Sequence, residues 1–346
     1  CVSVKLRRPT LCQAGNGDKE MADYILSVDG GGTKTEFCIS DMEGHIKESV
    51  VVGCSNYKSV GLGAVGESFQ AGLNLLEKKG IRRGDLRCSV WGISGCDSEH
   101  DFALVRAVLK DLGIDGKTCY LCNDGILAYY AQAMEPGMVV IAGTGSIILG
   151  IGRDGEYKRA SGWGYNISDI GSGYWIGAEA LKHTLLYCDG CGEYSPFYDC
   201  IREYFKADSF EHLPYVVTEV TDYYEIARLA ELVTEEAGRG EEVTLGILRH
   251  GAEVIARLMG SIHKRMGFDG GTELNIVFSG GVLKSRIYQQ LIKNELARQI
   301  PLEHVAFSLQ KNAPAYGGIR LAQRILEQRT REKDAGTRQA LKGGFS

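Results

Sequence analysis

A glycine-rich turn that follows an apolar run has the residue types needed to hold phosphate. Asp29-Gly-Gly-Gly-Thr-Lys-Thr35 offers backbone N–H groups without side chains in the way, two hydroxyls and one positive charge. A two-residue turn is enough for a hairpin, so this composition exceeds what chain reversal needs. It is not a Walker A loop, since no Gly-Lys-Thr triplet occurs and a strand-like segment follows. We predict that this turn binds phosphate through Gly31, Gly32, Thr33, Lys34 and Thr35, and that Asp29 holds Mg²⁺ through water.

A second turn, Gly143-Thr-Gly-Ser146, repeats this composition in the second half of the chain. A dinucleotide-binding Gly-x-Gly-x-x-Gly turn fails here, because Ile148 stands in the place of the third glycine. Two phosphate loops facing each other across a cleft would hold the β- and γ-phosphates from both sides. We therefore predict phosphate contacts from Gly143, Thr144, Gly145 and Ser146.

Asp124 follows a short apolar segment at the junction Cys122-Asn-Asp-Gly125. A carboxylate at such a strand-to-helix junction can accept a proton from a hydroxyl that attacks the γ-phosphate. The same residue could instead cap the N-terminus of the following helix. The residues alone leave both interpretations open.

The elements that must position these residues occur in the same order in both halves. In the first half, the patterns predict strands at 24–29, 33–40, 45–52, 88–93 and 118–122. They predict helices at 61–79, 99–112 and 124–134, which alternate with the last two strands. The second half opens with strands 138–142, 147–151 and 156–160. Helices 174–187, 196–206, 223–237 and 242–266, strand 275–279 and further helices follow. This recurrence predicts a duplicated α/β domain and not a series of dinucleotide-binding units.

These motifs together resemble the BadF/BadG/BcrA/BcrD-type ATPase family, and within it the kinases of the N-acetylglucosamine type. Gly162-Trp163, Asp169–Ile176, Ser279–Lys284 and Pro314–Gly317 complete the set, in the family's order, over about residues 23–327. The resemblance implies the actin-like ATPase (ribonuclease H-like) fold, with two duplicated domains around a nucleotide cleft. We expect domains at 23–136 and 137–328, with the last helix able to pack on the first domain. ATP and Mg²⁺ as cofactors and a homodimer are also implied.

The resemblance assigns roles to further residues. It makes Asp124 the catalytic base, and it places Asn56, Gly162, Trp163 and Asp169 around the sugar. It gives adenosine binding to Gly280, Gly281, Lys284 and Ser285, with Gly240 closing the other side of the base. The sequence alone leaves a simpler interpretation open for each segment. The Asn56 loop is also typical of an ordinary turn, the segment of Gly162, Trp163 and Asp169 of a glycine-rich loop beside the core, and the segment from Gly280 to Ser285 of the start of a helix.

Two departures leave the sugar open. Lys58 stands where the family often has Trp, and Ile170 stands where an acidic residue is usual. We therefore expect phosphorylation of the 6-hydroxyl of N-acetylglucosamine, of N-acetylmuramate, or of both.

Two other function classes compete with this interpretation. One is an ATPase that activates a 2-hydroxyacyl-CoA dehydratase or benzoyl-CoA reductase, whose relatives hold an iron–sulfur cluster between subunits through paired Cys. The other is a sugar-sensing regulator, which would carry a helix-turn-helix before the first phosphate loop; the first 20 residues are too few for one.

Composition and short sequence patterns limit which partners and which location we expect for the protein. A formal net charge of −5 argues against nucleic acid, and the best candidate for a bilayer span, Met138–Ile151, is interrupted by the second glycine turn. Residues 1–20 lack the apolar stretch of a secretory signal, so we expect residues 1–22 to be an extension and the protein to be cytoplasmic.

Cys188 and Cys191 have metal-ligand spacing, with Cys200 nearby, but no second Cys pair follows, so a zinc site is disfavoured. The polar tail 329–346 is expected to fray.

Overall fold

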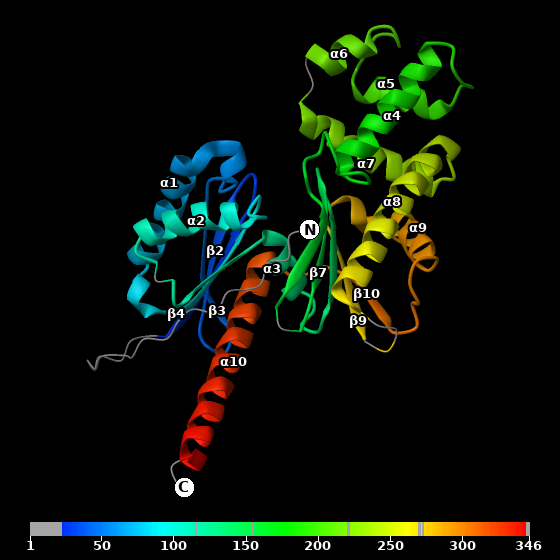
Figure 1. Ribbon diagram of the computed structural model, residues 1–346. Coiled ribbons are helices and arrows are strands. Elements are labelled where there is room, and N and C mark those ends of the chain that lie inside the picture. The colour runs from blue at the N-terminus through cyan, green and yellow to red at the C-terminus, as the bar shows by residue number, and fades with distance from the viewer. Residues whose placement is uncertain are drawn as a thin grey trace. The chain divides into compact units, whose positions relative to one another are not determined.

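The computed structural model describes residues 23–343 apart from 115, 154, 220, 221, 269, 270 and 272, with side chains to Arg331. The chain divides into two compact units. Unit 1 runs to Met134 and resumes at Gln310, and unit 2 is Glu135–Leu309 (Figure 1). The expected extension 1–22 lies outside the described residues.

Unit 1 is built on a five-stranded sheet in the order β3-β2-β1-β4-β5. Its strands are β1 (Tyr24–Gly30), β2 (Thr35–Ser40), β3 (Ile46–Val52), β4 (Leu86–Ile93) and β5 (Cys119–Cys122). β1, β2 and β3 pair antiparallel, whereas β4 and β5 continue the sheet parallel to β1. The carboxyl ends of β1, β4 and β5 therefore meet at one edge of the sheet.

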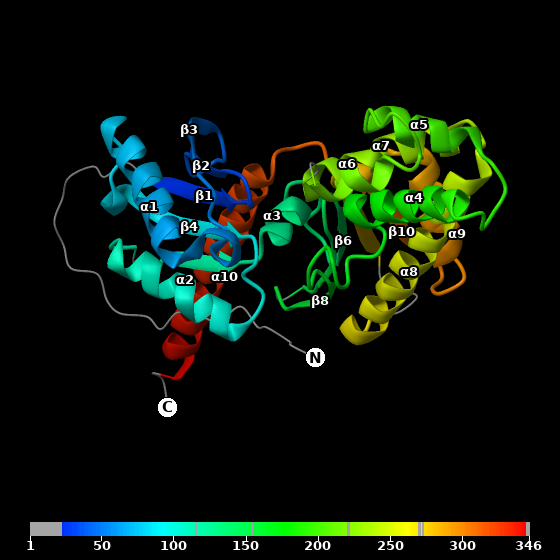
Figure 2. The ribbon, with the colours of Figure 1, turned by 90° about the horizontal axis from the view of Figure 1, so that it is seen from above.

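Helices cover both faces of this sheet (Figures 1 and 2). They are α1 (Tyr57–Lys78), α2 (Glu99–Asp111), α3 (Asp124–Tyr130) and α10 (Pro314–Gly343), with a 3-10 turn at Arg83–Asp85. α1 packs closely on β2, since a Cβ on Gly72 would lie 2.4 Å from the Phe37 ring. On the opposite face α10 reaches β1, where a Cβ on Gly318 would lie 2.0 Å from Ser27 Oγ.

α10 also supports α3, the helix that begins at Asp124. Arg320 Nη1 donates to the carbonyl of Tyr130 over 2.9 Å, and Asn312 Nδ2 donates to that of Ala131 over 2.9 Å. A Cβ on Gly317 would lie 1.9 Å from the carbonyl oxygen of Leu127, so the two backbones touch. The last carbonyl of the short α3 and that of the next residue are thus satisfied by α10 and by the segment just before it, which are distant in sequence.

Unit 2 repeats the topology of unit 1, with strand order β10-β9-β6-β7-β8. Its strands are β6 (Gly137–Ala142), β7 (Ser146–Ile151), β8 (Tyr157–Ser161), β9 (Leu274–Ser279) and β10 (Val305–Leu309). β6, β7 and β8 are antiparallel, and β9 and β10 are parallel to β6. The predicted duplication of an α/β domain is confirmed by this shared strand order.

The helices of unit 2 pack with its sheet to form the hydrophobic core of this unit. They are α4 (Gly173–Cys188), α5 (Pro196–Tyr204), α6 (Leu213–Glu219), α7 (Tyr223–Gly238), α8 (Glu242–Met266) and α9 (Arg286–Leu296), with a 3-10 turn at Val282–Lys284. The long α8 packs on β7, where a Cβ on Gly150 would lie 2.4 Å from Ile262. α8 ends at Gly267, which adopts the left-handed conformation (φ 67°) that terminates many helices.

Three elements differ from the sequence-based expectation. β10 and α6 were not predicted, because β10 is short and half-buried and α6 spans only seven residues. The tail after Gln328 continues α10 to Gly343 instead of fraying. Its Arg, Glu, Lys, Ala and Gln residues favour helix, and the helix continues through the single Gly336. No helix among the described residues is both long and apolar enough to span a bilayer.

Candidate active site

The first glycine turn is held rigidly by its neighbours in unit 1. The carbonyl of Gly30 accepts the N–H of Ser94 at 2.8 Å, and that of Gly31 accepts the N–H of Ser55 at 3.2 Å. A Cβ on Gly30 would lie 2.3 Å from Ser55 Oγ, so no other residue fits there. Because its carbonyls are engaged by the protein, the turn is preorganised for a ligand.

The outer residues of this turn are exposed, as a phosphate loop requires. Gly32, Thr33 and Lys34 are open to solvent. Thr35 is the exception among the predicted contacts, because it is fully buried and its hydroxyl donates to the carbonyl of Gly53 over 2.7 Å. Its hydroxyl braces the loop from inside, and the placement does not support a phosphate contact from it.

Three carboxylates lie at the carboxyl ends of the parallel strands of unit 1, at the same sheet edge. Asp29 is the next-to-last residue of β1, Asp97 comes after β4, and Asp124 comes after β5. Burial raises the pKa of Asp29 to about 6, with the Glu36 charge adding to the shift and Lys34 opposing it. Burial also raises the pKa of Asp124 to about 7, and the charges of Asp29 and Asp97 act in the same direction. Asp124 is thus the kind of carboxyl group that can take up a proton near neutral pH.

Asp124 is the first residue of α3, and the capping role falls to its neighbour. Asn123 Oδ1 accepts the N–H of Gly125 at 2.8 Å, which makes Asn123 the N-cap. The interpretation of Asp124 as merely the cap is therefore wrong. Asp124 Oδ1 accepts the same N–H at 3.0 Å, and Asp124 is half-buried.

Asn56, the predicted sugar contact, begins α1. Its Oδ1 accepts the N–H of Lys58 at 3.1 Å, and its Nδ2 lies 3.5 Å from Ser94 Oγ. A Cβ on Gly95 would lie 2.8 Å from Asn56 Oδ1, so only glycine lets this side chain occupy its place. Asn56 is half-buried and has one weak amide contact that a sugar hydroxyl could replace.

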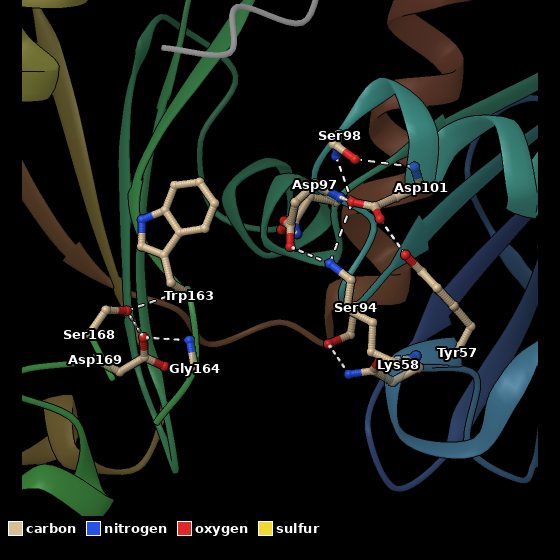
Figure 3. Close-up of polar contacts among 12 residues, drawn as sticks. Tyr57, Lys58, Ser94, Asp97, Ser98, Asp101, Trp163, Gly164, Ser168 and Asp169 are labelled. Atoms are coloured by element: carbon tan, nitrogen blue, oxygen red, sulfur yellow. Dashed lines mark hydrogen bonds and ion pairs between the residues drawn. The ribbon is translucent and has the colours of Figure 1, made fainter. Parts of the chain in front are cut away.

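A polar network between α1 and α2 was missed from the sequence. Asp101 accepts the hydroxyl of Tyr57, the ammonium of Lys58 at 3.4 Å, and the backbone N–H groups of Asp97 and Ser98 at 2.9 and 2.8 Å (Figure 3). Burial alone would raise the pKa of Asp101, but these donors hold it at about 2. The available signal was the capping box Ser98-Glu-His-Asp101 before an apolar helical pattern.

The second glycine turn, in unit 2, is built like the first. The N–H of Gly143 donates to the carbonyl of Gly145 over 2.9 Å, and the carbonyl of Gly143 accepts the N–H of Gly173, the first residue of α4, at 2.7 Å. Gly143, Thr144 and Gly145 are partly exposed. Ser146 parallels Thr35, since it is buried and its hydroxyl donates inward to the carbonyl of Ile170 over 3.3 Å.

Asp169, predicted to bind sugar hydroxyls, is engaged by the protein. Its Oδ2 accepts the N–H of Ser146 at 3.1 Å, and its Oδ1 accepts the hydroxyl of Ser168 at 2.7 Å and the N–H of Gly164 at 3.3 Å (Figure 3). The side chain is 6% exposed. Its position therefore fits the bracing of two loops, and a sugar could reach only the lone pairs that remain.

The loop that carries Trp163 is strained. Ser161 has a φ of 61° and Gly162 a φ of 75°, and a non-glycine residue in this region carries an energetic cost. Trp163 is 65% exposed, with the Arg159 guanidinium 3.7 Å from its ring centroid, and its ring points away from the Asp169 carboxylate (Figure 3). An exposed indole of this kind can pack on the apolar face of a sugar.

The predicted adenosine motif lies against the second glycine turn within unit 2. A Cβ on Gly280 would lie 2.3 Å from the carbonyl oxygen of Ala142, and Gly280 has a φ of 95°. Gly281 and Lys284 are exposed, whereas Ser285 caps α9 by accepting the N–H of Tyr288 at 3.4 Å. Gly240, with a φ of 91°, joins α7 to α8 and is exposed.

Cys188 and Cys191 are exposed and Cys200 is half-buried. Cys188 Sγ donates to the carbonyl of Thr184 over 3.2 Å, and all three thiols are free of disulfides.

Comparison with known proteins gives consistent matches along most of the chain. The sequence model of the BadF/BadG/BcrA/BcrD ATPase family matches residues 26–318. The N-acetyl-D-glucosamine kinase of Dictyostelium discoideum is 28% identical over 81% of this chain and 92% of its own length. The N-acetylmuramic acid/N-acetylglucosamine kinase of Clostridium acetobutylicum is 28% identical over 86% of this chain and 98% of its own.

Among solved structures, a candidate N-acetylglucosamine kinase from Chromobacterium violaceum matches with a TM-score of 0.65 and 23% identity. The match covers 87% of this chain and 99% of that one. At this identity the likeness bears on the fold, and it confirms the predicted actin-like ATPase fold.

Proposed function

Because the chain belongs to the BadF/BadG/BcrA/BcrD ATPase family, we propose that it is an ATP-dependent kinase of amino sugars. The observation that carries this proposal is Asp124, a half-buried carboxyl at the end of β5 whose pKa is raised to about 7. It shares its sheet edge with Asp29 and the exposed glycine turn that follows β1. A base and a phosphate loop in one unit are the parts that phosphoryl transfer requires.

In this mechanism Asp124 accepts the proton of the sugar 6-hydroxyl as the oxygen attacks the γ-phosphate, and the bond from the γ-phosphorus to the β–γ bridging oxygen breaks to release ADP. Asn56 would hold a neighbouring hydroxyl of the sugar and so orient the nucleophile. The backbone N–H groups of the exposed residues Gly32 and Thr33 and the charge of Lys34 would stabilise the negative charge on the phosphoryl oxygens.

The residues fit a divalent cation near Asp29. The raised pKa of this carboxyl means that it ionises most readily when a positive charge lies close by. Mg²⁺, when bound, would neutralise phosphate charge, and Asp29 would hold it through water.

Unit 2 would contribute the remaining binding groups. Gly280 and Gly281 would let adenosine lie against the backbone, with Lys284, Ser285 and Gly240 around it. The partly exposed Gly143, Thr144 and Gly145 would meet the phosphates, with Ser146 bracing their turn from inside. Gly162, Trp163 and Asp169 would shape the sugar site, with Trp163 offering its apolar ring and Asp169 bracing the loop.

The substrate we propose is an N-acetylated amino sugar. The Dictyostelium and Clostridium relatives are named for N-acetylglucosamine and for N-acetylmuramic acid with N-acetylglucosamine. Lys58 and Ile170 lie beside the predicted sugar contacts Asn56 and Asp169 in the sequence, so they are the positions from which we expect selectivity between these sugars.

We further propose that the protein acts as a cytoplasmic homodimer. Light scattering of the purified chain would test the dimer, and a monomer at micromolar concentration would contradict it.

The direct test is an ADP-release assay with ATP and Mg²⁺ across a panel of N-acetylated and free amino sugars. We expect turnover with N-acetylglucosamine or N-acetylmuramate, and an Asp124→Asn variant that binds sugar but loses at least about 1,000-fold in kcat. Near-normal turnover of Asp124→Asn would refute the assignment of the base. A brown protein that hydrolyses ATP without any sugar would instead favour the iron–sulfur activator.

A further inference from the structure

Asp97 lies where the segment carrying the predicted sugar contact meets the segment carrying the predicted base. It follows β4, next to Ser94 and Gly95, and its side chain is 11% exposed. Its Oδ1 accepts the side-chain N–H of Asn123 at 2.8 Å, and its Oδ2 is 3.6 Å from Lys58 Nζ. One carboxylate thus contacts both the residue before Asp124 and the first turn of α1.

The contact with Asn123 fixes how α3 begins. The amide of Asn123 has its oxygen on the N–H of Gly125 and its nitrogen on Asp97. With both ends engaged, the side-chain amide cannot flip without breaking both bonds. Asp124 is the next residue, so its backbone direction depends on this cap.

Asp97 is itself held in place. Its backbone N–H donates to Asp101 Oδ2 over 2.9 Å, and the Asp101 carboxylate also accepts hydrogen bonds from the side chains of Tyr57 and Lys58. Asp101 is 5% exposed and is the third residue of α2, where it forms a capping box with Ser98. Buried charged groups with several donors form rigid supports, because breaking any one bond leaves an unsatisfied charge.

We propose that Asp97 is a positioning residue for phosphoryl transfer, which orients Asp124 through Asn123 and ties Lys58 and the Asn56 segment to the same point. This inference rests on the proposed function in so far as Asp124 is the base. Its structural part, that Asp97 sets the conformation of Asn123, stands independently of any reaction.

The test compares variants that differ in what they leave at position 97. Asp97→Ala removes the acceptor for Asn123 and should lower kcat about 100-fold, with KM for ATP within about twofold, since misplacing a reacting group by about 1 Å has such an effect. Asp97→Asn keeps an amide oxygen for Asn123 and should recover kcat to within about 10-fold of the wild type. Glu99→Gln, an exposed carboxylate change in the first turn of α2, is the matched control and should leave kcat unchanged.

Lys58→Met separates the two contacts of Asp97. It removes the ion pair and leaves the bond to Asn123, so we expect a higher KM for the sugar and kcat within about threefold of the wild type. If Asp97→Ala does not fold, Asp97→Ser, which is too short to reach Asn123, takes its place with the same expectation.

The side-chain amide resonances of Asn123, assigned by their loss in Asn123→Ser, give a readout independent of activity. They should show slow hydrogen exchange in the wild type and Asp97→Asn, and fast exchange in Asp97→Ala. Wild-type kcat in Asp97→Ala, equal losses in Asp97→Ala and Asp97→Asn, or unchanged Asn123 exchange would overturn the proposal. A wild type with no sugar kinase activity would refute the proposed function, while the exchange data would still decide the role of Asp97.

Discussion

Asp124→Asn should stabilise the folded protein while it removes turnover. The folded-state pKa of Asp124 is raised from 3.8 to about 7, first by burial and then by Asp29 and Asp97. Between these two pKa values the folded chain binds a proton that the unfolded chain releases. Stability therefore falls as pH rises through this window, and the cost is complete above pH 7. Asparagine has no charge and does not incur this cost.

The size of the pKa shift of Asp124 sets how much stability the Asp124→Asn variant should gain. About three pKa units correspond to a ceiling of about 4 kcal/mol at pH 8, since each unit is worth about 1.4 kcal/mol. At about pH 5 the folded carboxyl is protonated and only the interval from 3.8 remains, so the cost falls to about 1.6 kcal/mol. Because Asp124 is half-buried, solvent reduces both values, and we expect a measured gain of about 1–3 kcal/mol at pH 8.

The assay is urea unfolding of wild type and variant at about pH 8 and about pH 5, without nucleotide or Mg²⁺. Asp111→Asn, an exposed carboxylate change on α2, is the control and should shift the free energy of unfolding by less than about 0.5 kcal/mol. A variant that is less stable than the wild type at pH 8, or a gain that does not shrink at pH 5, would refute the reasoning.

Three further predictions concern the second glycine turn, its support at Gly280 and the α1–α2 network. Gly280→Ala should lower the free energy of unfolding by about 2–4 kcal/mol in a urea titration, because its Cβ would lie 2.3 Å from the carbonyl oxygen of Ala142 and its φ is 95°; wild-type stability would contradict the geometry. Gly145→Ala, whose Cβ would lie 2.5 Å from Asp169 Oδ2, should raise KM for ATP about tenfold or more in steady-state kinetics, and an unchanged KM would argue against a phosphate role. Asp101→Asn should lower the free energy of unfolding by about 2–4 kcal/mol at pH 7, because the ionised carboxylate accepts hydrogen bonds from several donors. The pKa of Asp101 is held at about 2, so this loss of stability should disappear as pH falls from about 4 towards 2. A loss that does not depend on pH would contradict the charge argument.

Much of the fold was predictable because local patterns and turn chemistry agreed. The glycine turns after Asp29 and Ala142 mark hairpins in both units, and the strand order repeats around them. The patterns of β10 and α6 are too short to predict these elements, and the polar composition of the tail does not show where α10 ends. Charged helix-forming residues are compatible with a continuing helix, and the single Gly336 among them does not end α10.

The site was less predictable, because a residue type does not reveal where its side chain points. Thr35 and Ser146 carry hydroxyls at the right positions in sequence, yet both donate inward to carbonyls. Asp169 likewise braces two loops. Asp97 and Asp101 were overlooked since their role depends on contacts with Asn123, Tyr57 and Lys58, which are distant in sequence.

The most direct test of the kinase assignment is ³¹P NMR of the purified protein with ATP, Mg²⁺ and N-acetylglucosamine or N-acetylmuramate. The account predicts one sugar 6-phosphate for each ATP consumed, and no such signal with Asp124→Asn. Release of inorganic phosphate at the same rate with and without sugar would contradict it.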